Sequence, residues 1–293
     1  MPSLLTLDQA LELSRSQVRE LYRTYLNPGL VTMLELLDFD RRFVAARGAE
    51  VRDAAGNTYL DFLGGYGALN LGHNHPAVLE ALRRVEERPN LLQASLNPVA
   101  AALAHNLAQL TPGNLQRSFF CNSGAEAVEG ALKLARAVTG KSQIVYCSNS
   151  FHGKTFGALS VTGRAKYRRP FEPLVPDCVE IPFGDGGALE KVLKQGNAAA
   201  FIVEPIQGEG GVIVPPPGYL ARARELCTRY GALLIADEIQ TGLGRTGYMW
   251  ACEHEEVVPD VLCVAKSLGG GVAAIGAYVT TDTLWKKAYG GLE

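Results

Sequence analysis

A lysine and an aspartate each follow an apolar run of the chain, and their types suggest chemistry on a bound cofactor. Asp237 comes after Ala232–Ala236, and Lys266 comes after Val261–Ala265. A lysine at the end of a buried strand must pair with a charge, change its pKa or form a covalent adduct. A desolvated lysine with a lowered pKa is the nucleophile that forms Schiff bases.

Three further apolar runs end in residues that suit the same chemistry. A helix start of small residues, Ser123-Gly124-Ala125, comes shortly after Ser118–Cys121. An aromatic residue and a histidine, Phe151-His152, follow Gln143–Cys147, and two acids, Glu204 and Glu209, follow Ala199–Val203. A helix that starts beside a glycine presents backbone N–H groups to an anion, and its dipole favours phosphate there.

Together these residue types match pyridoxal phosphate (PLP). This cofactor needs an amine for its aldehyde, an anion site for its phosphate and a carboxylate that keeps its ring nitrogen protonated, and it gains from an aromatic side chain on its ring. Each feature also has a structural explanation. Ser123-Gly124-Ala125 could be a helix cap alone, Phe151 a core residue, and Asp237 a helix cap or half of an ion pair.

Alternating strands and helices are expected to position these residues. The apolar runs named above are predicted as strands, with helices between most of them. One helix, at 125–138, is strongly amphipathic, and its Glu129 and Lys133 are expected to pair on the exposed face. Near-continuous apolar strands alternating with helices predict an α/β fold with a central, mostly parallel sheet. Ligands bind beyond the carboxyl ends of such strands.

The first part of the chain has a different pattern. Residues 4–26 are predicted as one amphipathic helix, and residues 43–62 as a β meander. A glycine-rich loop at 64–67 follows. We therefore expect an N-terminal segment of helix and meander at 1–62 and a PLP-binding large domain at 63–293.

Composition narrows the class of protein. The chain has 293 residues, 47% of them hydrophobic and 20% charged, the balance of a globular protein with a sizeable core. Its net charge of −2 does not favour binding to nucleic acid or to a membrane surface. The six cysteines form no C-x-x-C pair, and no signal peptide or membrane span is recognisable. A reduced, cytoplasmic protein is therefore expected.

Five stretches, in this order, resemble the class III aminotransferases of PLP fold type I. They are CNSGAEAVEGALKLAR, SFHGKTFGALS, VEPIQGEGGV, ADEIQTGLGRTG and VAKSLGGG. The resemblance extends from about residue 40 to the end of the sequence. Further runs, among them LGGYGALNLGH and WACEHEEVVPD, are most similar to the putrescine aminotransferases of this class, with the ornithine and acetylornithine enzymes next.

The resemblance implies a role for each matching residue. Those that hold the cofactor would be Lys266 as the Schiff-base lysine, Asp237 at the pyridine nitrogen, Gln240 near the ring hydroxyl, Ser123, Gly124 and Ala125 at the phosphate, Phe151 on the ring, and His152 and Glu204 nearby. Two residues would face the substrate. Tyr66 matches a position that lines the substrate pocket, and Glu209 matches a glutamate that pairs with an arginine and moves between substrates.

The implied activity is transfer of a terminal amino group from a diamine, putrescine first, to 2-oxoglutarate, which gives an aldehyde and glutamate. A homodimer is implied as well. The alternatives are ornithine or acetylornithine as the donor, or a truncated PLP-binding chain with little activity. The last alternative arises because relatives continue past residue 293 with a second phosphate-binding segment and a small domain that supplies a carboxylate-binding arginine. That C-terminal small domain is expected to be missing.

Two other motifs are interpreted as structural. Gly242–Gly247 satisfies G-x-G-x-x-G, but acids stand between the strand and the glycines, and Asp260 follows sooner than the about 20 residues expected of a nicotinamide site. His73-x-His75 and Cys252-x-His254 lack a third ligand at a plausible spacing, so no metal site is predicted.

Overall fold

The computed structural model describes residues 4–89 and 95–290, and the chain divides into two compact units. The N-terminal unit is Met1–Leu63 with Gly72–His75, and the large unit is Gly64–Leu71 with Pro76–Glu293. The short segment Gly72–His75 belongs with the N-terminal unit, where His73 forms an antiparallel bridge to Gly48. The domain boundary predicted between residues 62 and 63 stays a prediction.

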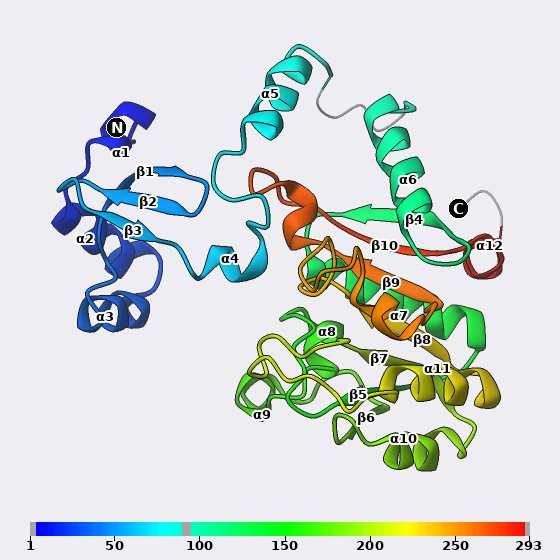
Figure 1. Ribbon diagram of the computed structural model, residues 1–293. Helices are drawn as coiled ribbons and strands as arrows, with labels where there is room; N and C mark the ends of the chain where they lie inside the picture. Colours follow the sequence, from blue (N-terminus) through cyan, green and yellow to red (C-terminus); the bar gives the residue numbers. More distant parts are fainter. Residues whose placement is uncertain (1–3, 90–94, 291–293) are drawn as a thin grey trace. The chain divides into compact units, whose positions relative to one another are not determined.

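In its described part, the N-terminal unit combines short helices with a three-stranded antiparallel sheet in the order β1-β2-β3 (Figure 1). Its elements are α1 (Leu7–Leu11), α2 (Arg15–Tyr25), α3 (Pro28–Leu36), β1 (Phe43–Arg47), β2 (Glu50–Asp53) and β3 (Thr58–Leu60). The β meander is thus confirmed. The single helix predicted over 4–26 is wrong, because Thr6 and Ser14 each start a separate helix with a capping box.

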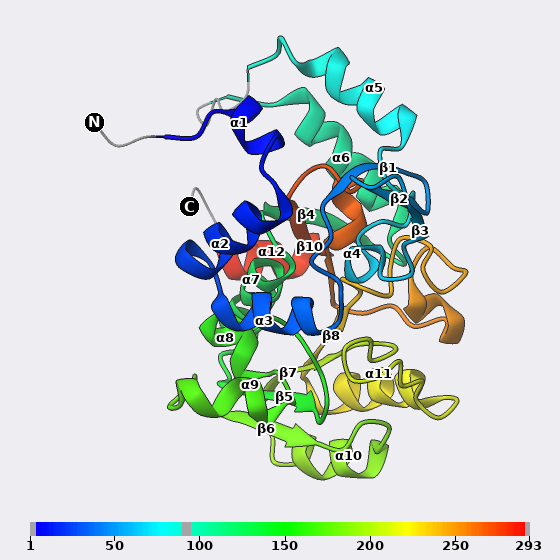
Figure 2. The same cartoon turned by 90° about the vertical axis from the view of Figure 1, so that its left-hand side faces the viewer.

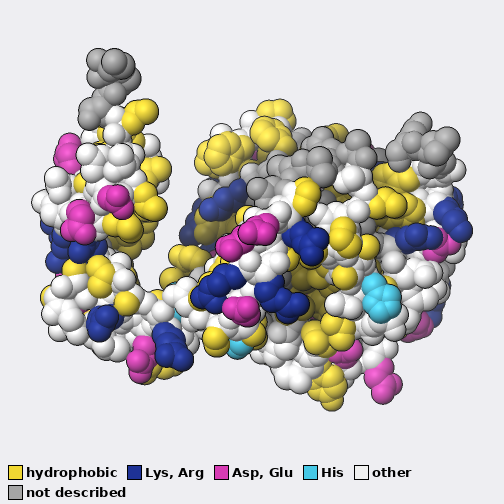
Figure 3. All heavy atoms as spheres, turned by 90° about the horizontal axis from the view of Figure 1, so that it is seen from above, with side chains coloured by type: hydrophobic (Ala, Val, Ile, Leu, Met, Phe, Trp, Pro, Cys, Tyr) yellow, Lys and Arg dark blue, Asp and Glu magenta, His cyan; other side chains and the backbone are white. Residues whose placement is uncertain are grey.

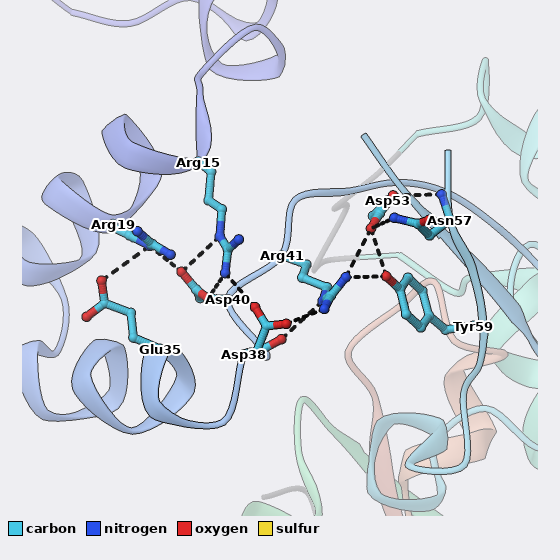
Figure 4. Close-up of polar contacts among 9 residues, drawn as sticks. All are labelled: Arg15, Arg19, Glu35, Asp38, Asp40, Arg41, Asp53, Asn57 and Tyr59. Carbon is cyan, nitrogen blue, oxygen red and sulfur yellow. Dashed lines mark hydrogen bonds and ion pairs between the residues drawn. The ribbon is translucent and has the colours of Figure 1, made fainter. Parts of the chain in front are cut away.

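A network of charged side chains joins the helices of the N-terminal unit to the segment that leads into its sheet (Figure 4). Arg15 and Arg19 of α2 both bind the carboxylate of Asp40, and Arg15 also pairs with Asp38 at 2.9 Å. Asp38 in turn binds Arg41. The hydrogen bond from Arg15, followed by that from Arg19, holds the pKa of Asp40 well below its usual range.

The Asp53 carboxylate organises the turn between β2 and β3 (Figure 4). One oxygen accepts from the backbone N–H groups of Ala55 at 3.0 Å and Asn57 at 2.9 Å. The other accepts from the Asn57 side-chain amide at 3.0 Å and the Tyr59 hydroxyl at 2.9 Å. These hydrogen bonds, that of the Asn57 side chain above all, lower the pKa of Asp53 to about 2.

The described part of the large unit is built on a seven-stranded sheet in the order β4-β10-β9-β8-β7-β5-β6 (Figures 1 and 2). The strands are β4 (Leu115–Cys121), β5 (Gln143–Cys147), β6 (Cys178–Ile181), β7 (Ala198–Val203), β8 (Leu233–Asp237), β9 (Val261–Val264) and β10 (Gly276–Thr281). Neighbours from β6 to β9 are parallel, whereas β10 is antiparallel to both β9 and β4. The predicted α/β fold with a mostly parallel sheet is confirmed, although β6 and β10 were not predicted.

Helices cover both faces of this sheet. One face carries α7 (Gly124–Thr139), α8 (Phe156–Ser160) and α12 (Asp282–Tyr289), and the other carries α6 (Pro98–Leu110), α10 (Gly186–Leu193) and α11 (Tyr219–Tyr230). The fully buried strand β7 serves both cores, since Phe201 packs into one and Ile202 into the other. The remaining elements are short or peripheral: α4 (Gly64–Gly67), α5 (Pro76–Val85), α9 (Ala165–Arg168), η1 (Arg169–Phe171), η2 (Ala251–Glu255) and η3 (Lys266–Gly269).

The expected ion pair between Glu129 and Lys133 is wrong. One oxygen of Glu129 instead accepts from the Thr155 hydroxyl at 2.6 Å and from the backbone N–H groups of Gly157 at 2.8 Å and Ala158 at 3.1 Å. The first N–H groups of a helix have no partner within it, so this carboxylate caps α8. A cap from a residue so distant in sequence has no local signal.

The cysteines, the helix lengths and the surface charges add three further observations about the described residues. All six cysteines are free, with Cys121 and Cys178 partly exposed and the others buried. No helix among the described residues has the length and apolar character needed to cross a bilayer. On the face drawn in Figure 3, acidic and basic side chains are interspersed.

Replacing Asp53 by Asn should destabilise the N-terminal unit. The asparagine side chain would place an N–H₂ group where the second carboxylate oxygen now accepts from the Asn57 amide and the Tyr59 hydroxyl, so donors would face donors. Hydrogen exchange of the β1–β3 amides should accelerate, and the unit's melting temperature should fall by about 2–4 °C at pH 7. Because the pKa is lowered in the folded state, this difference should be complete above about pH 5 and shrink toward pH 2. A difference that stays constant with pH would contradict this role of Asp53. The control is Glu80→Gln, which removes an exposed ion pair of α5.

Candidate active site

The carboxyl ends of β4, β5, β7, β8 and β9 lie at one edge of the sheet, and a pocket of about 520 Å³ opens there within the large unit. All but one of the predicted site residues line it: Ser123, Gly124, Ala125, Phe151, His152, Glu204, Glu209, Asp237, Gln240 and Lys266. The exception is Tyr66, which lies outside the lining. The direction of the strands therefore gathers residues that lie up to 143 positions apart in the sequence.

Lys266 follows β9 with a left-handed backbone, at a φ of 44°. A non-glycine residue pays strain for this conformation, which is found most often at functional sites. Burial lowers the pKa of the Lys266 ammonium, while the carboxylates of Asp237 and Glu209 act in the opposite direction. A larger share of the neutral, nucleophilic amine follows from the net shift.

Asp237 is the last residue of β8 and is 3% exposed. One of its oxygens lies 2.6 Å from Nδ1 of His152, and the other accepts from the backbone N–H of Ile239 at 3.1 Å. With the carboxylate ionised, Nδ1 is the donor. The carboxylate is therefore fixed at the pocket wall and still has lone pairs for one more donor.

Glu204 follows β7 and is also buried, with 5% of its surface exposed. Its two oxygens accept from the backbone N–H groups of Phe151 at 2.9 Å and Gly208 at 3.1 Å. Burial raises the pKa of Glu204 to about 7; His152 opposes this shift and Asp237 adds to it. The charge of this group therefore changes near neutral pH.

The start of α7 forms the part of the pocket suited to an anion. Ser123 is the N-cap, and its hydroxyl accepts from the backbone N–H of Glu126 at 3.2 Å. The N–H groups of Gly124 and Ala125 stand in the first turn, where an anion is favoured. Glycine is needed at 124 because a Cβ there would lie 2.8 Å from the side chain of Ile239.

Gln240 connects the pocket to the glycine-rich loop at 64–67. Its side-chain amide donates to the backbone carbonyl of Tyr66 at 2.8 Å. It also packs on Gly208, where a Cβ would lie only 1.4 Å from the Gln240 amide oxygen. Tyr66 thus contributes a backbone carbonyl, while its side chain is largely exposed and its predicted substrate contact stays a prediction.

Two cationic residues at this site were missed by the sequence reasoning. Lys154 lines the pocket, and the Arg164 guanidinium donates to the backbone carbonyl of Glu209 at 2.7 Å. Both lie over the ring of Tyr167, at 5.4 and 5.2 Å from its centroid. Lys154 directly follows residues 148–153, the segment after β5 that contains Phe151 and His152. Including one more residue of this segment among the candidates would have found it. Arg164 has no such signal.

Two histidines of the possible metal motifs, His73 and His254, have other contacts. Nε2 of His73 lies 2.8 Å from Asp61, and Nε2 of His254 lies 3.1 Å from the carbonyl of Thr246. Cys252 is buried. Among residues 4–89 and 95–290, no three side chains of metal-ligating type gather at one point.

The family model "Aminotransferase class-III" matches residues 38–291. The chain belongs to the class III aminotransferases. This aminotransferase chain is 48% identical over 280 residues to aminotransferase PigE of Serratia sp., covering 94% of its own length and 33% of PigE. It therefore spans about a third of that curated relative.

Solved aminotransferase structures share the fold. Ornithine aminotransferase of Toxoplasma gondii superposes with a TM-score of 0.87 at 38% identity, over 97% of this chain and 68% of that one. An (S)-enantioselective omega-transaminase of Thermomicrobium roseum gives 0.83 at 32% identity, over 90% and 65%. Class III aminotransferases depend on PLP, and one T. gondii structure holds PLP at partial occupancy.

The residues of this chain fit that cofactor. The pocket offers a half-buried amine from Lys266, a fixed carboxylate from Asp237 and the first turn of α7, beside the side chain of Phe151. An aldehyde, a ring nitrogen, a phosphate and a ring face are the four groups these residues would meet. The individual roles assigned to them by resemblance stay predictions.

The cofactor-free chain should lose stability as pH rises through 7, and Glu204 should cause much of the loss. A carboxyl whose pKa is higher in the folded than in the unfolded state stabilises the fold at low pH, and this contribution disappears as pH passes the folded pKa. The contribution amounts to about 3 kcal/mol between pH 5 and pH 8. Urea unfolding should therefore show a shallower pH slope for Glu204→Gln than for the wild type. Equal slopes would contradict the assignment.

Proposed function

We propose that this chain carries out PLP-dependent transamination of a terminal primary amine, with Lys266 and Asp237 as its catalytic residues. The observation that carries the proposal is that one pocket holds both the Lys266 amine and the buried Asp237 carboxylate. The homodimer implied by the resemblance is part of the proposal.

When bound, PLP supplies a protonated ring that accepts the electron pair left when a C–H bond next to the donor nitrogen breaks. Asp237 keeps the proton on the ring nitrogen, and its bond to His152 keeps Asp237 in place. Lys266 would hold the cofactor through its amine, whose lowered pKa increases the share of the neutral form, and the same amine would take the proton from the substrate carbon. The N–H groups of Gly124 and Ala125 would bind the phosphate.

The proposed donor is a diamine such as putrescine. Glu209 lines the pocket, and within the described residues no ion pair to its carboxylate is present. Its negative charge suits the second ammonium of a diamine at the far end from the reacting nitrogen. The similarity to an ornithine aminotransferase and to omega-transaminases supports a terminal amine as the reacting group.

Ornithine is the second candidate donor, because the pocket wall also holds a cation. Lys154 lines the pocket and could bind the carboxylate of ornithine. The same ammonium suits a carboxylate of 2-oxoglutarate, the proposed acceptor. Lys154 is therefore compatible with both donors.

Borohydride reduction of the chain with PLP should label Lys266. The neutral amine reacts with the aldehyde, and reduction makes the bond permanent. Peptide mapping should find the label in the wild type and in Lys154→Ala, and lose it in Lys266→Ala, which should also lose all measurable transamination. Because Lys154 lines the same pocket, it is the matched control. Label on Lys154 would overturn the assignment.

Replacing Glu209 by Gln should discriminate between donors. The KM for putrescine should rise by about tenfold, because a charge-assisted contact to the second ammonium is lost. The KM for butylamine, which has no second ammonium, should stay unchanged. Steady-state kinetics with both donors and 2-oxoglutarate give the comparison. An equal rise for both amines would rule out recognition of the second charge by Glu209.

A further inference from the structure

Two loops of the pocket carry groups with different tasks in the proposed reaction. The loop after β5, residues 148–153, carries Phe151. The segment after β7 forms a tight hairpin at 207–213, which carries Glu209 and is closed by paired backbone hydrogen bonds between Gln207 and Ile213. We call these the Phe151 loop and the Glu209 hairpin.

One carboxylate touches both. Glu204 binds the N–H of Phe151 with one oxygen at 2.9 Å and the N–H of Gly208, inside the Glu209 hairpin, with the other at 3.1 Å. Both contacts are to backbone donors, and Glu204 itself stands at the end of the fully buried strand β7. The Glu204 side chain therefore connects both segments to a fully buried strand of the sheet.

The chemistry of these two contacts requires a carboxylate. Each contact needs an acceptor, and both oxygens of a carboxyl group have lone pairs that can accept. A glutamine would present an N–H₂ group to one of the two backbone N–H donors, and an aspartate is one methylene shorter. Neither substitute can satisfy both N–H groups at the observed distances.

A second side chain, that of Gln207, also joins the two segments, but it binds the loop at Ser148 and not at Phe151. The Gln207 side-chain amide donates to the carbonyl of Ser148 at 2.7 Å, and Arg164 donates to the carbonyl of Glu209. These bonds keep the segments attached when Glu204 is changed. Neither bond involves the N–H of Phe151, which is held by Glu204.

We propose that Glu204 is a positioning residue that couples the Phe151 loop to the Glu209 hairpin at the N–H groups of Phe151 and Gly208, and thereby aligns the cofactor ring face with the substrate-binding carboxylate. This inference rests on the proposed function for its consequences in catalysis. Its structural part, the shared contact, can be tested in the cofactor-free chain.

The first experiment measures amide hydrogen exchange, residue by residue, in the cofactor-free chain. In Glu204→Gln, at least one of the Phe151 and Gly208 amides should exchange about tenfold faster or more, and in Glu204→Ala both should. Glu255→Ala is the matched control. Glu255 also accepts from two backbone N–H groups, those of Gly218 and Ala221 at 2.9 Å each, and it does not line the pocket. Its variant should accelerate only those two amides.

The second experiment examines the PLP-loaded chain. In Glu204→Ala, the visible circular dichroism of bound PLP should weaken and the KM for the diamine should rise about tenfold, whereas Glu255→Ala should leave both unchanged. A purely structural role for Glu204 would lower the melting temperature without changing the dichroism of the remaining bound cofactor.

The outcomes separate the two proposals. Acceleration of only one of the two amides in Glu204→Ala, or of neither, would overturn the coupling. Acceleration of both with unchanged dichroism and KM would overturn the positioning role. If the wild type fails to bind PLP or to transaminate, the proposed function fails, and the exchange data still decide whether Glu204 joins the two segments.

Discussion

The direction of five strands determines everything else at this site. β10 is antiparallel to both β4 and β9, and these two reversals leave β4 running the same way as β5, β7, β8 and β9. The residues that follow all five strands therefore face one edge, and the amine, carboxylates and helix start are brought together from segments far apart in sequence. If β4 ran the other way, the first turn of α7 would begin at the opposite edge and the pocket would lack its anion-binding part.

The pocket concentrates opposing charges where water is scarce. Asp237 and Glu204 are almost fully buried, and His152 and Lys266 lie among them. Isolated charges would be costly here, so each group is held by hydrogen bonds or shifts its pKa. Asp237 is paired with His152, Glu204 binds two N–H groups with a raised pKa, and Lys266 has a lowered one. The lowered pKa of Lys266 increases the share of its neutral amine, the form that attacks an aldehyde.

The sequence predicted those parts of the structure that have a local signal. Apolar runs of strand length located β5, β7, β8 and β9, and the residue after each run located most of the pocket. Failures occurred where distant contacts compete with local pattern. Glu129 has Lys133 at helical spacing but caps α8 instead. Residues 4–26 have helical periodicity, yet the capping box at Ser14 starts a new helix. Tyr66 lies next to Gln240 through its carbonyl, which no side-chain pattern reveals.

The division between strand ends and loops explains why the reaction class is easier to infer than the substrate. Lys266 and Asp237 stand at the ends of buried strands, where the sheet fixes their positions and the set of suitable residue types is small. Glu209, Lys154 and the loop at 64–67 lie on connecting segments, whose course depends on bonds such as those of Glu204 and Gln240. Cofactor chemistry thus depends on strand direction and burial, while donor choice depends on how these loops are held. A change in one loop contact can therefore alter which amine fits without altering the reaction.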